Sequence, residues 1–250
     1  MLKTFKTQDF RFRQICQHLP KYDDFRKRFQ TDFSFFSCLA MAVDALLPEL
    51  AGNDPLDYLQ SAITNCTLEE TKKIVDKIME YRTSKRYNYD TLKNITEKGI
   101  CNIYEVLNSS NARIHPNEFV KFFNVYFLIK KIPIILDHFK NPSKLKPKIL
   151  YDLLQTKMLY GYVPIMALEK TTRDKIILDH SIMFGGVNFI GMIFSDPNSS
   201  EPYLIDNDYL LKIFRKKIFS HNKKNKLKIN KDSAIIFVRE KKRHKVNLVD

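Results

Sequence analysis

The pattern of apolar positions divides the chain into a helical first part and a last part rich in strands. Apolar residues recur at helical spacing from Ser37 to Leu47. Pro48 stops this run, and Ser37 has the short polar side chain of an N-cap, so we expect the helix to begin there. These bounds place Cys38 in the first turn of a buried helix.

The segment from residue 55 to residue 140 is expected to be mostly helical. Thr67 and Glu70 have capping-box spacing, in front of an amphipathic run that continues to about Tyr81. A second helix is expected from His115, which is followed by Pro, to about Lys130. It contains aromatic residues at helical spacing, which predict a core or partner-facing stripe: Phe119, Phe122, Phe123, Tyr126 and Phe127.

The pattern changes after Pro147. A short amphipathic helix is expected from Ile149 to Leu159, and apolar runs separated by turn residues predict strands at 163–168, 176–184, 189–194, 203–205 and 234–238. Helices followed by strands indicate the α+β class rather than alternating α/β. We expect one domain over residues 1–250, in which 52–147 form a helical lobe and 220–250 a basic C-terminal segment, with helices packed against an antiparallel sheet.

Positive charge is concentrated at one end of the chain. The formal net charge is +14, and residues 212–250 contain fourteen Lys and Arg but three acidic residues. This basic segment predicts either an anionic partner, nucleic acid or acidic lipid, or a solvated lysine-rich surface. No apolar run is long enough to span a membrane, and the N-terminus lacks the apolar stretch of a secretory signal. We therefore expect a cytoplasmic protein, or an effector exported without a classical signal.

The cysteines do not form a metal or disulfide pattern. Cys16, Cys38, Cys66 and Cys101 include no C-x-x-C pair and no zinc-finger spacing. His138 follows an Asp, but no second ligand stands at helical spacing, and phosphate-binding glycine motifs are absent from the sequence. We expect no metal and no cofactor. Three of the thiols are expected to be structural, which leaves Cys38.

Cys38, His180 and Asp196 have the residue types and the settings of a nucleophilic site. A helix start lowers the pKa of a thiol, and an adjacent imidazole can take its proton. His180 lies in an apolar strand, and Asp196 follows the next strand. A turn at 185–188 would bring the two side chains together, so that the carboxylate fixes the imidazole tautomer. Asp179 and Asp206 are alternative carboxylates.

The residues around these three positions resemble the C39-like branch of papain-like cysteine peptidases. The similar segments are Gly161-Tyr-Val-Pro-Ile-Met, His180-Ser-Ile-Met-Phe-Gly-Gly-Val and Phe194-Ser-Asp-Pro-Asn, and the resemblance covers about residues 28–50 and 150–215. The gap of 142 residues between Cys38 and His180 agrees with it. Two positions depart from the family: Leu39 replaces the usual Gly after the cysteine, and Asp32 stands where the family has the oxyanion-binding Gln, so Gln30 is the nearest candidate.

The resemblance implies a thiol-dependent hydrolase that cleaves a protein or peptide substrate at a peptide or isopeptide bond. Cys38 would attack the carbonyl, His180 would take the thiol proton, and Asp196 would orient His180. The N–H of Cys38, helped by Gln30, would bind the oxyanion. The same triad could pass the acyl group to an amine, as in an acyltransferase or transglutaminase-like enzyme. A third possibility is a non-catalytic papain-like module that binds polyanions or an anionic membrane through the basic segment.

Overall fold

The computed structural model describes residues 8–16, 18–23, 33–64, 67, 69–70, 72–74, 76, 116–171, 176–222, 225–230 and 233–241. The predicted helix beyond residue 76, the oxyanion candidate Gln30, and the positions Asp32, Cys66 and Cys101 lie outside the described residues.

One antiparallel sheet organises the described chain. Its strands follow the order β2-β9-β3-β4-β5-β6, with bounds Ile134–Lys140, Ala234–Glu240, Val163–Thr171, Ile176–Val187, Gly191–Ser195 and Tyr203–Asp206. Three shorter strands lie off this path. β1 (Gln8–Asp9) pairs with β4, and β7 (Ile218–Asn222) forms a hairpin with β8 (Asn225–Lys228), which also pairs with β3. The predicted 234–238 strand is therefore part of the sheet. The β7–β8 hairpin, at the start of the basic segment, is part of it too.

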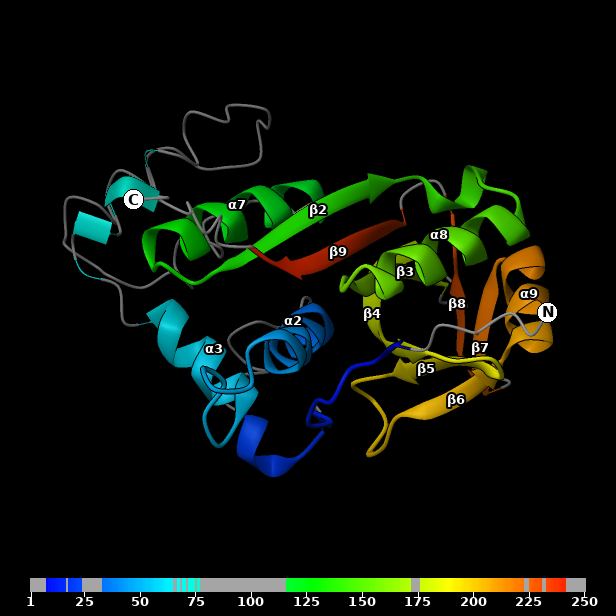
Figure 1. Ribbon diagram of the computed structural model, residues 1–250, viewed down its shortest axis with the longest axis horizontal. Coiled ribbons are helices and arrows are strands. Elements are labelled where there is room, and N and C mark those ends of the chain that lie inside the picture. Colours follow the sequence, from blue (N-terminus) through cyan, green and yellow to red (C-terminus); the bar gives the residue numbers. More distant parts are fainter. Residues whose placement is uncertain are drawn as a thin grey trace, which may run out of the picture.

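The helices cover this sheet, and the molecule is α+β as predicted. The longer ones are α2 (Phe33–Leu46), α3 (Pro55–Thr64), α7 (Pro116–Ile129), α8 (Pro147–Leu159) and α9 (Asn207–Lys216), with short 3-10 turns η1 (Pro20–Tyr22) and η2 (Pro142–Lys144). α7 lies along β2, while α2 packs on β3, β4 and β9 (Figure 1). No helix within the described ranges is long and apolar enough to cross a membrane.

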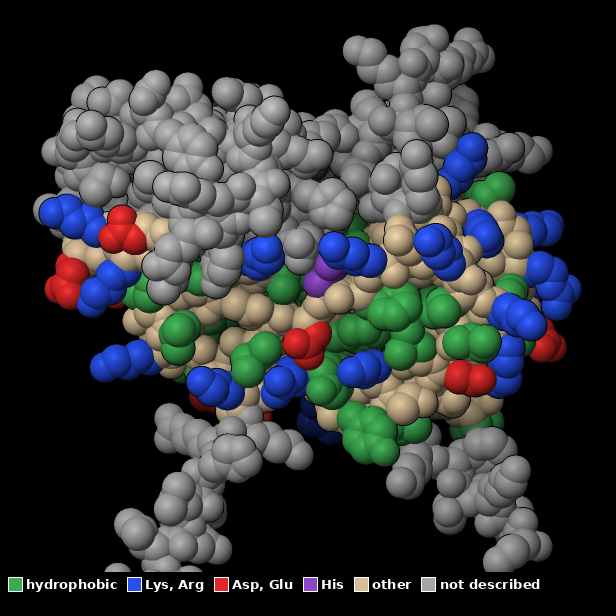
Figure 2. Space-filling view, turned by 90° about the horizontal axis from the view of Figure 1, so that it is seen from above, with side chains coloured by type: hydrophobic (Ala, Val, Ile, Leu, Met, Phe, Trp, Pro, Cys, Tyr) green, Lys and Arg blue, Asp and Glu red, His purple; other side chains and the backbone are tan. Residues whose placement is uncertain are grey.

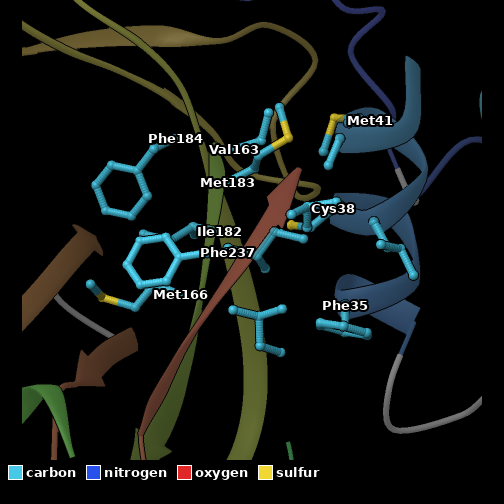
Figure 3. Close-up of a cluster of buried hydrophobic side chains, with 14 of the residues drawn as sticks. Phe35, Cys38, Met41, Val163, Met166, Ile182, Met183, Phe184 and Phe237 are labelled. Carbon is cyan, nitrogen blue, oxygen red and sulfur yellow. The ribbon is translucent and has the colours of Figure 1, made fainter. Parts of the chain in front are cut away.

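The central helix α2 is buried around its whole circumference. All side chains from Ser34 to Asp44 are buried, which is typical of a helix at the centre of a core. Figure 3 shows Phe35, Cys38 and Met41 directed from α2 into an apolar cluster formed by the strands. On its other side α2 contacts α7, where the ring of Phe36 meets that of Phe123 at a centroid distance of 5.6 Å.

The aromatic stripe predicted on α7 is core. Phe123, Tyr126 and Phe127 are buried and in ring contact with one another. The side chains of Phe119 and Phe122 lie outside the description.

The capping box at Thr67 is also present. The N–H of Thr67 donates to Oε2 of Glu70 at 2.9 Å, and the N–H of Glu70 donates to Oγ1 of Thr67 at 3.1 Å. The sequence signature therefore corresponds to the reciprocal bonds expected of it.

Three predicted boundaries are wrong. α2 begins at Phe33 rather than Ser37, because Phe35 and Phe36 are held in the helix by core packing. Residues 134–140, expected within the helical lobe, form β2, which pairs with β9 about a hundred residues later. The turn expected at 185–188 lies at 188–190, because Gly185, Gly186 and Val187 continue strand β4.

A short N-terminal arm, residues 8–16, ties α2 to the sheet. Phe10 donates its N–H to the carbonyl of Gly185 at 3.0 Å, next to the β1–β4 pairing. Further along, Arg13 forms an ion pair with the buried Asp44 of α2, and its own N–H donates to the same carboxylate at 2.6 Å. The arm thus contacts α2, which carries Cys38, and β4, which carries His180.

Candidate active site

His180 and Asp196 form a buried pair on two neighbouring strands. The β4–β5 register places Met183 opposite Ser195, so Asp196, directly after β5, lies beside the His180 side of β4. Nε2 of His180 is 2.8 Å from Oδ1 of Asp196. Because a carboxylate only accepts, Nε2 carries the hydrogen in the neutral ring and Nδ1 keeps its lone pair. The expected proximity of these two side chains is present, and the pair can act as a general base.

The turn that carries Asp196 is held by the N-terminal arm. Gln14 donates from Nε2 to the carbonyl oxygens of Asp196, at 3.0 Å, and Ser199, at 3.1 Å. Its Oε1 accepts from the hydroxyl of Ser195 at 2.6 Å. The side-chain amide of Gln14 therefore binds Ser195, Asp196 and Ser199, and fixes the turn that carries the carboxylate. The sequence analysis missed Gln14, because no motif marks a contact across about 180 residues of chain.

Asn198 is a second neighbour of the imidazole. Its Nδ2 is 3.4 Å from each ring nitrogen of His180, and its Oδ1 is 2.9 Å from Nε2 of His18. The N–H of Asn198 also donates to Oδ1 of Asp196 at 2.8 Å. The turn after β5 therefore supplies the carboxylate and a polar neighbour for the ring. Its position directly after Asp196-Pro197 is the sequence signal that identifies it.

Among the described residues, Cys38 forms no hydrogen bond with the imidazole of His180. Its Sγ instead donates a hydrogen bond to the backbone carbonyl of Ser181 at 3.4 Å. The side chain is 0% exposed. Burial, with a smaller contribution from the charge of Asp196, raises the pKa of Cys38 well above its ordinary value. At neutral pH the sulfur is therefore a protonated thiol, which is a poor nucleophile.

The position of Cys38 along α2 also differs from the prediction. It is the sixth residue of the helix rather than part of the first turn. An N–H at that position belongs to the internal hydrogen-bond ladder of the helix. It is not available to an oxyanion, and the terminal partial charge of the helix falls off within its first turn. The predicted role of the Cys38 N–H in binding an oxyanion therefore has no support from its position in the helix.

Ser34 occupies the place on α2 that the sequence analysis assigned to Cys38. It is the second residue of α2 and lies one turn before Cys38 on the same face. Its Oγ accepts the backbone N–H of Ser181, the residue after His180, at 3.1 Å. Among the described residues its hydroxyl hydrogen has no acceptor. The first-turn N–H groups around it are those that a helix leaves without internal partners.

Ser34 and Cys38 together cap one residue of β4. Pairing of β4 with β5 begins at Met183, so the outer edge of β4 is open at Ser181. The two α2 side chains bind the N–H and the C=O of Ser181 at this edge. This satisfies two buried backbone groups, which would otherwise cost free energy. The contact also fixes α2 against the strand that carries His180.

The remaining predicted site residues fall elsewhere. Asp206 is the N-cap of α9, where its Oδ1 accepts from the N–H of Tyr209 at 2.8 Å, so it does not orient His180. The side chain of Asp179 is outside the described part of the chain, as are Gln30 and Asp32. Cys16 is a half-buried free thiol.

No group of three or more His, Cys, Asp and Glu side chains in the described ranges is arranged to hold a metal ion. The chain matches no protein-family model, no curated protein and no solved structure. The assignment of function therefore depends on the geometry of the site itself.

Proposed function

We propose that this chain is a papain-like hydrolase that cleaves peptide or isopeptide bonds with the His180–Asp196 pair as its base and Ser34 as the attacking group. The observation that carries the proposal is the contact between Ser34 Oγ and the N–H of Ser181. This contact places the Ser34 hydroxyl, in the first turn of α2, beside the backbone of Ser181, the residue after His180.

Ser34 is preferred to Cys38 on accessibility and on position in the helix. Ser34 is 6% exposed and His180 is 7% exposed, whereas Cys38 is sealed at 0%. A nucleophile must reach a substrate carbonyl, and an oxyanion needs N–H donors that the helix does not use. The start of α2 has the greater exposure and the N–H groups without internal partners, and the position of Cys38 one turn later has neither.

The reaction follows from the tautomer of His180. After rotation of the Ser34 side chain away from the N–H of Ser181, its Oγ attacks the substrate carbonyl carbon while Nδ1 of His180 takes the hydroxyl proton. The imidazolium is stabilised by Asp196 and returns the proton to the leaving amine. Water then attacks the acyl-serine, with His180 again as the base. First-turn N–H groups of α2 donate to the oxyanion in both steps.

Cys38 stays the thiol candidate of the sequence-based hypothesis. It lies on the same face of α2 as Ser34, and its use would require the sulfur to leave the carbonyl of Ser181 and lose its proton. Transfer of the acyl group to an amine instead of water uses the same residues, so the acyltransferase alternative shares this mechanism.

The two nucleophiles are separated by matched substitutions. Hydrolysis of an activated ester such as p-nitrophenyl acetate is measured for Ser34→Ala, Cys38→Ala and His180→Ala. Both α2 variants lose one hydrogen bond to Ser181, so each controls for the structural effect of the other. We expect Ser34→Ala and His180→Ala to lose activity by about 100-fold or more, and Cys38→Ala to stay within a few fold of wild type.

The opposite ranking, with Cys38→Ala inactive and Ser34→Ala active, would establish the thiol hydrolase. Ester hydrolysis that is the same in wild type and in all three variants would show that none of these residues catalyses it. That result would support the non-catalytic module. Ser34→Cys places a thiol nucleophile at the same position. Compared with Ser34→Ala, this variant should recover acylation, and iodoacetamide should inhibit its activity.

A further inference from the structure

Large apolar side chains are exposed together at one end of the sheet. Phe189 and Ile190 form the tip of the β4–β5 hairpin, Leu204 lies on β6, and Tyr209 is in the first turn of α9. Each is between 46% and 66% exposed. Figure 1 shows this end of β5 and β6 next to α9. Single exposed apolar residues are normal, whereas a group of them on one edge indicates a binding surface.

The tip is held rigidly against α9. Asn207, the first residue of α9, donates its N–H to the carbonyl of Ile190 at 3.0 Å and its side-chain amide to the carbonyl of Phe189 at 3.1 Å. Within the turn, Oδ1 of Asn188 accepts the N–H groups of Ile190 and Gly191, both at 2.9 Å. These bonds fix the backbone of the turn while its two apolar side chains remain outside.

Cations continue this surface along α9. Tyr209, Lys212 and Lys216 lie at helical spacing on one exposed face, and Arg215 is exposed beside them. None of these three cations forms an ion pair with another described residue. The acidic residues on the same helix end are Asp206, which caps the helix, and Asp208. Figure 2 shows further Lys and Arg side chains on the side of the molecule where α8 and α9 lie.

We propose that the hairpin tip and the exposed face of α9 form a docking surface for an anionic lipid bilayer. Phe189, Ile190 and Leu204 would enter the boundary between headgroups and acyl chains, while Tyr209 lies at headgroup level and Lys212 and Lys216 pair with anionic headgroups. The aliphatic side chains of Ile190 and Leu204 beside the cations favour lipid over nucleic acid, because a bilayer can bury aliphatic groups among its acyl chains, whereas exposed bases chiefly stack on aromatic rings. Of the two anionic partners expected from the basic segment, the proposal selects acidic lipid rather than nucleic acid. It places the contact at the hairpin tip and α9.

Vesicle sedimentation tests the proposal. The full chain is mixed with vesicles of phosphatidylcholine alone or of phosphatidylcholine with phosphatidylserine. We expect it to sediment with the second kind. Lys212→Glu with Lys216→Glu should weaken binding on the order of 1,000-fold, since each basic residue at the surface contributes about 1 kcal/mol and reversal of the charge doubles the change. Phe189→Ser with Ile190→Ser should weaken it by about tenfold or more.

Matched controls use exposed residues outside the hairpin tip, β6 and α9, including Leu128 on α7 and Tyr160 at the end of α8. Lys72→Glu with Lys131→Glu makes the same change in charge, and Leu128→Ser with Tyr160→Ser removes the same kind of exposed apolar side chains. Both should bind like wild type. All substituted side chains are exposed, so circular dichroism should show each variant folded.

Three results would overturn the proposal. The first is that the chain does not sediment with phosphatidylserine vesicles. The second is that the test pairs and the control pairs weaken vesicle binding equally. The third is that the α9 variant keeps vesicle binding but loses oligonucleotide binding or self-association.

Discussion

At the scale of single residues, Ser181 determines how α2 meets the sheet. Ser34 and Cys38 bind its N–H and its C=O from consecutive turns of one helix. The thiol is thereby a hydrogen-bond donor, which requires it to stay protonated. A residue that looks catalytic by its type thus has a structural role in this geometry, and the hydroxyl one turn earlier lies nearer the helix end.

The protonated state of Cys38 predicts a pH-dependent loss of stability. Its pKa in the folded protein is raised by burial, whereas the unfolded thiol titrates at about 8.5. Above that pH the unfolded chain loses a proton that the folded chain keeps, so the free energy of unfolding falls as pH rises, by at most about 1.4 kcal/mol per pH unit. Urea unfolding of wild type and Cys38→Ala between about pH 7 and pH 10 measures this difference.

The stability difference between the two proteins should shrink over that range, with wild type losing more. A difference that does not change with pH would mean that the folded thiol titrates like the unfolded one, and would contradict the structural role.

Residue types predicted the contact between His180 and Asp196 but not the position of Cys38 in its helix. His180 and Asp196 could be predicted because strand periodicity and a turn signal place them on adjacent strands. Ser34 could not, because the aromatic residues around it have weak helix propensity and hide the helix start. Gln14 and His18 contact the site over long stretches of chain, which a single sequence does not reveal.

At the scale of elements, most strands and helices were predicted because their apolar patterns are strong. α8, β3, β4, β5, β6 and β9 lie close to their expected bounds. β2 was missed because it follows α7 directly and its partner, β9, is about a hundred residues away. Such pairing is set by tertiary context, which local propensity does not contain.

The β5–β6 pair depends on a glycine at its start. A Cβ on Gly191 would overlap the backbone carbonyl of Ile205, which cannot move without breaking the strand pairing. Gly191→Ala should therefore lower the free energy of unfolding by about 1–3 kcal/mol. Gly185→Ala is the matched control, since its Cβ would meet the ring of Phe12, a side chain that can rotate. Urea unfolding compares the two, and equal losses would contradict the assigned clash.

At the scale of the whole molecule, the site is assembled from three parts that are far apart in sequence. The arm contributes Gln14, α2 contributes Ser34, and the β4–β5 pair contributes His180 and Asp196. The arm contacts both others, through the Arg13–Asp44 ion pair and through the bonds of Gln14. The geometry of the candidate site therefore depends on the packing of all three parts.

The most direct test of the account is to map where a serine-directed fluorophosphonate reagent attaches to the folded protein. Mass spectrometry of the digested adduct identifies the modified residue, with His180→Ala and Ser34→Ala treated in parallel. We predict one adduct, on Ser34, absent from both variants, with Cys38 unmodified by iodoacetamide under native conditions. An unmodified Ser34, together with alkylation of Cys38 at least as fast as that of Cys16, would contradict the account.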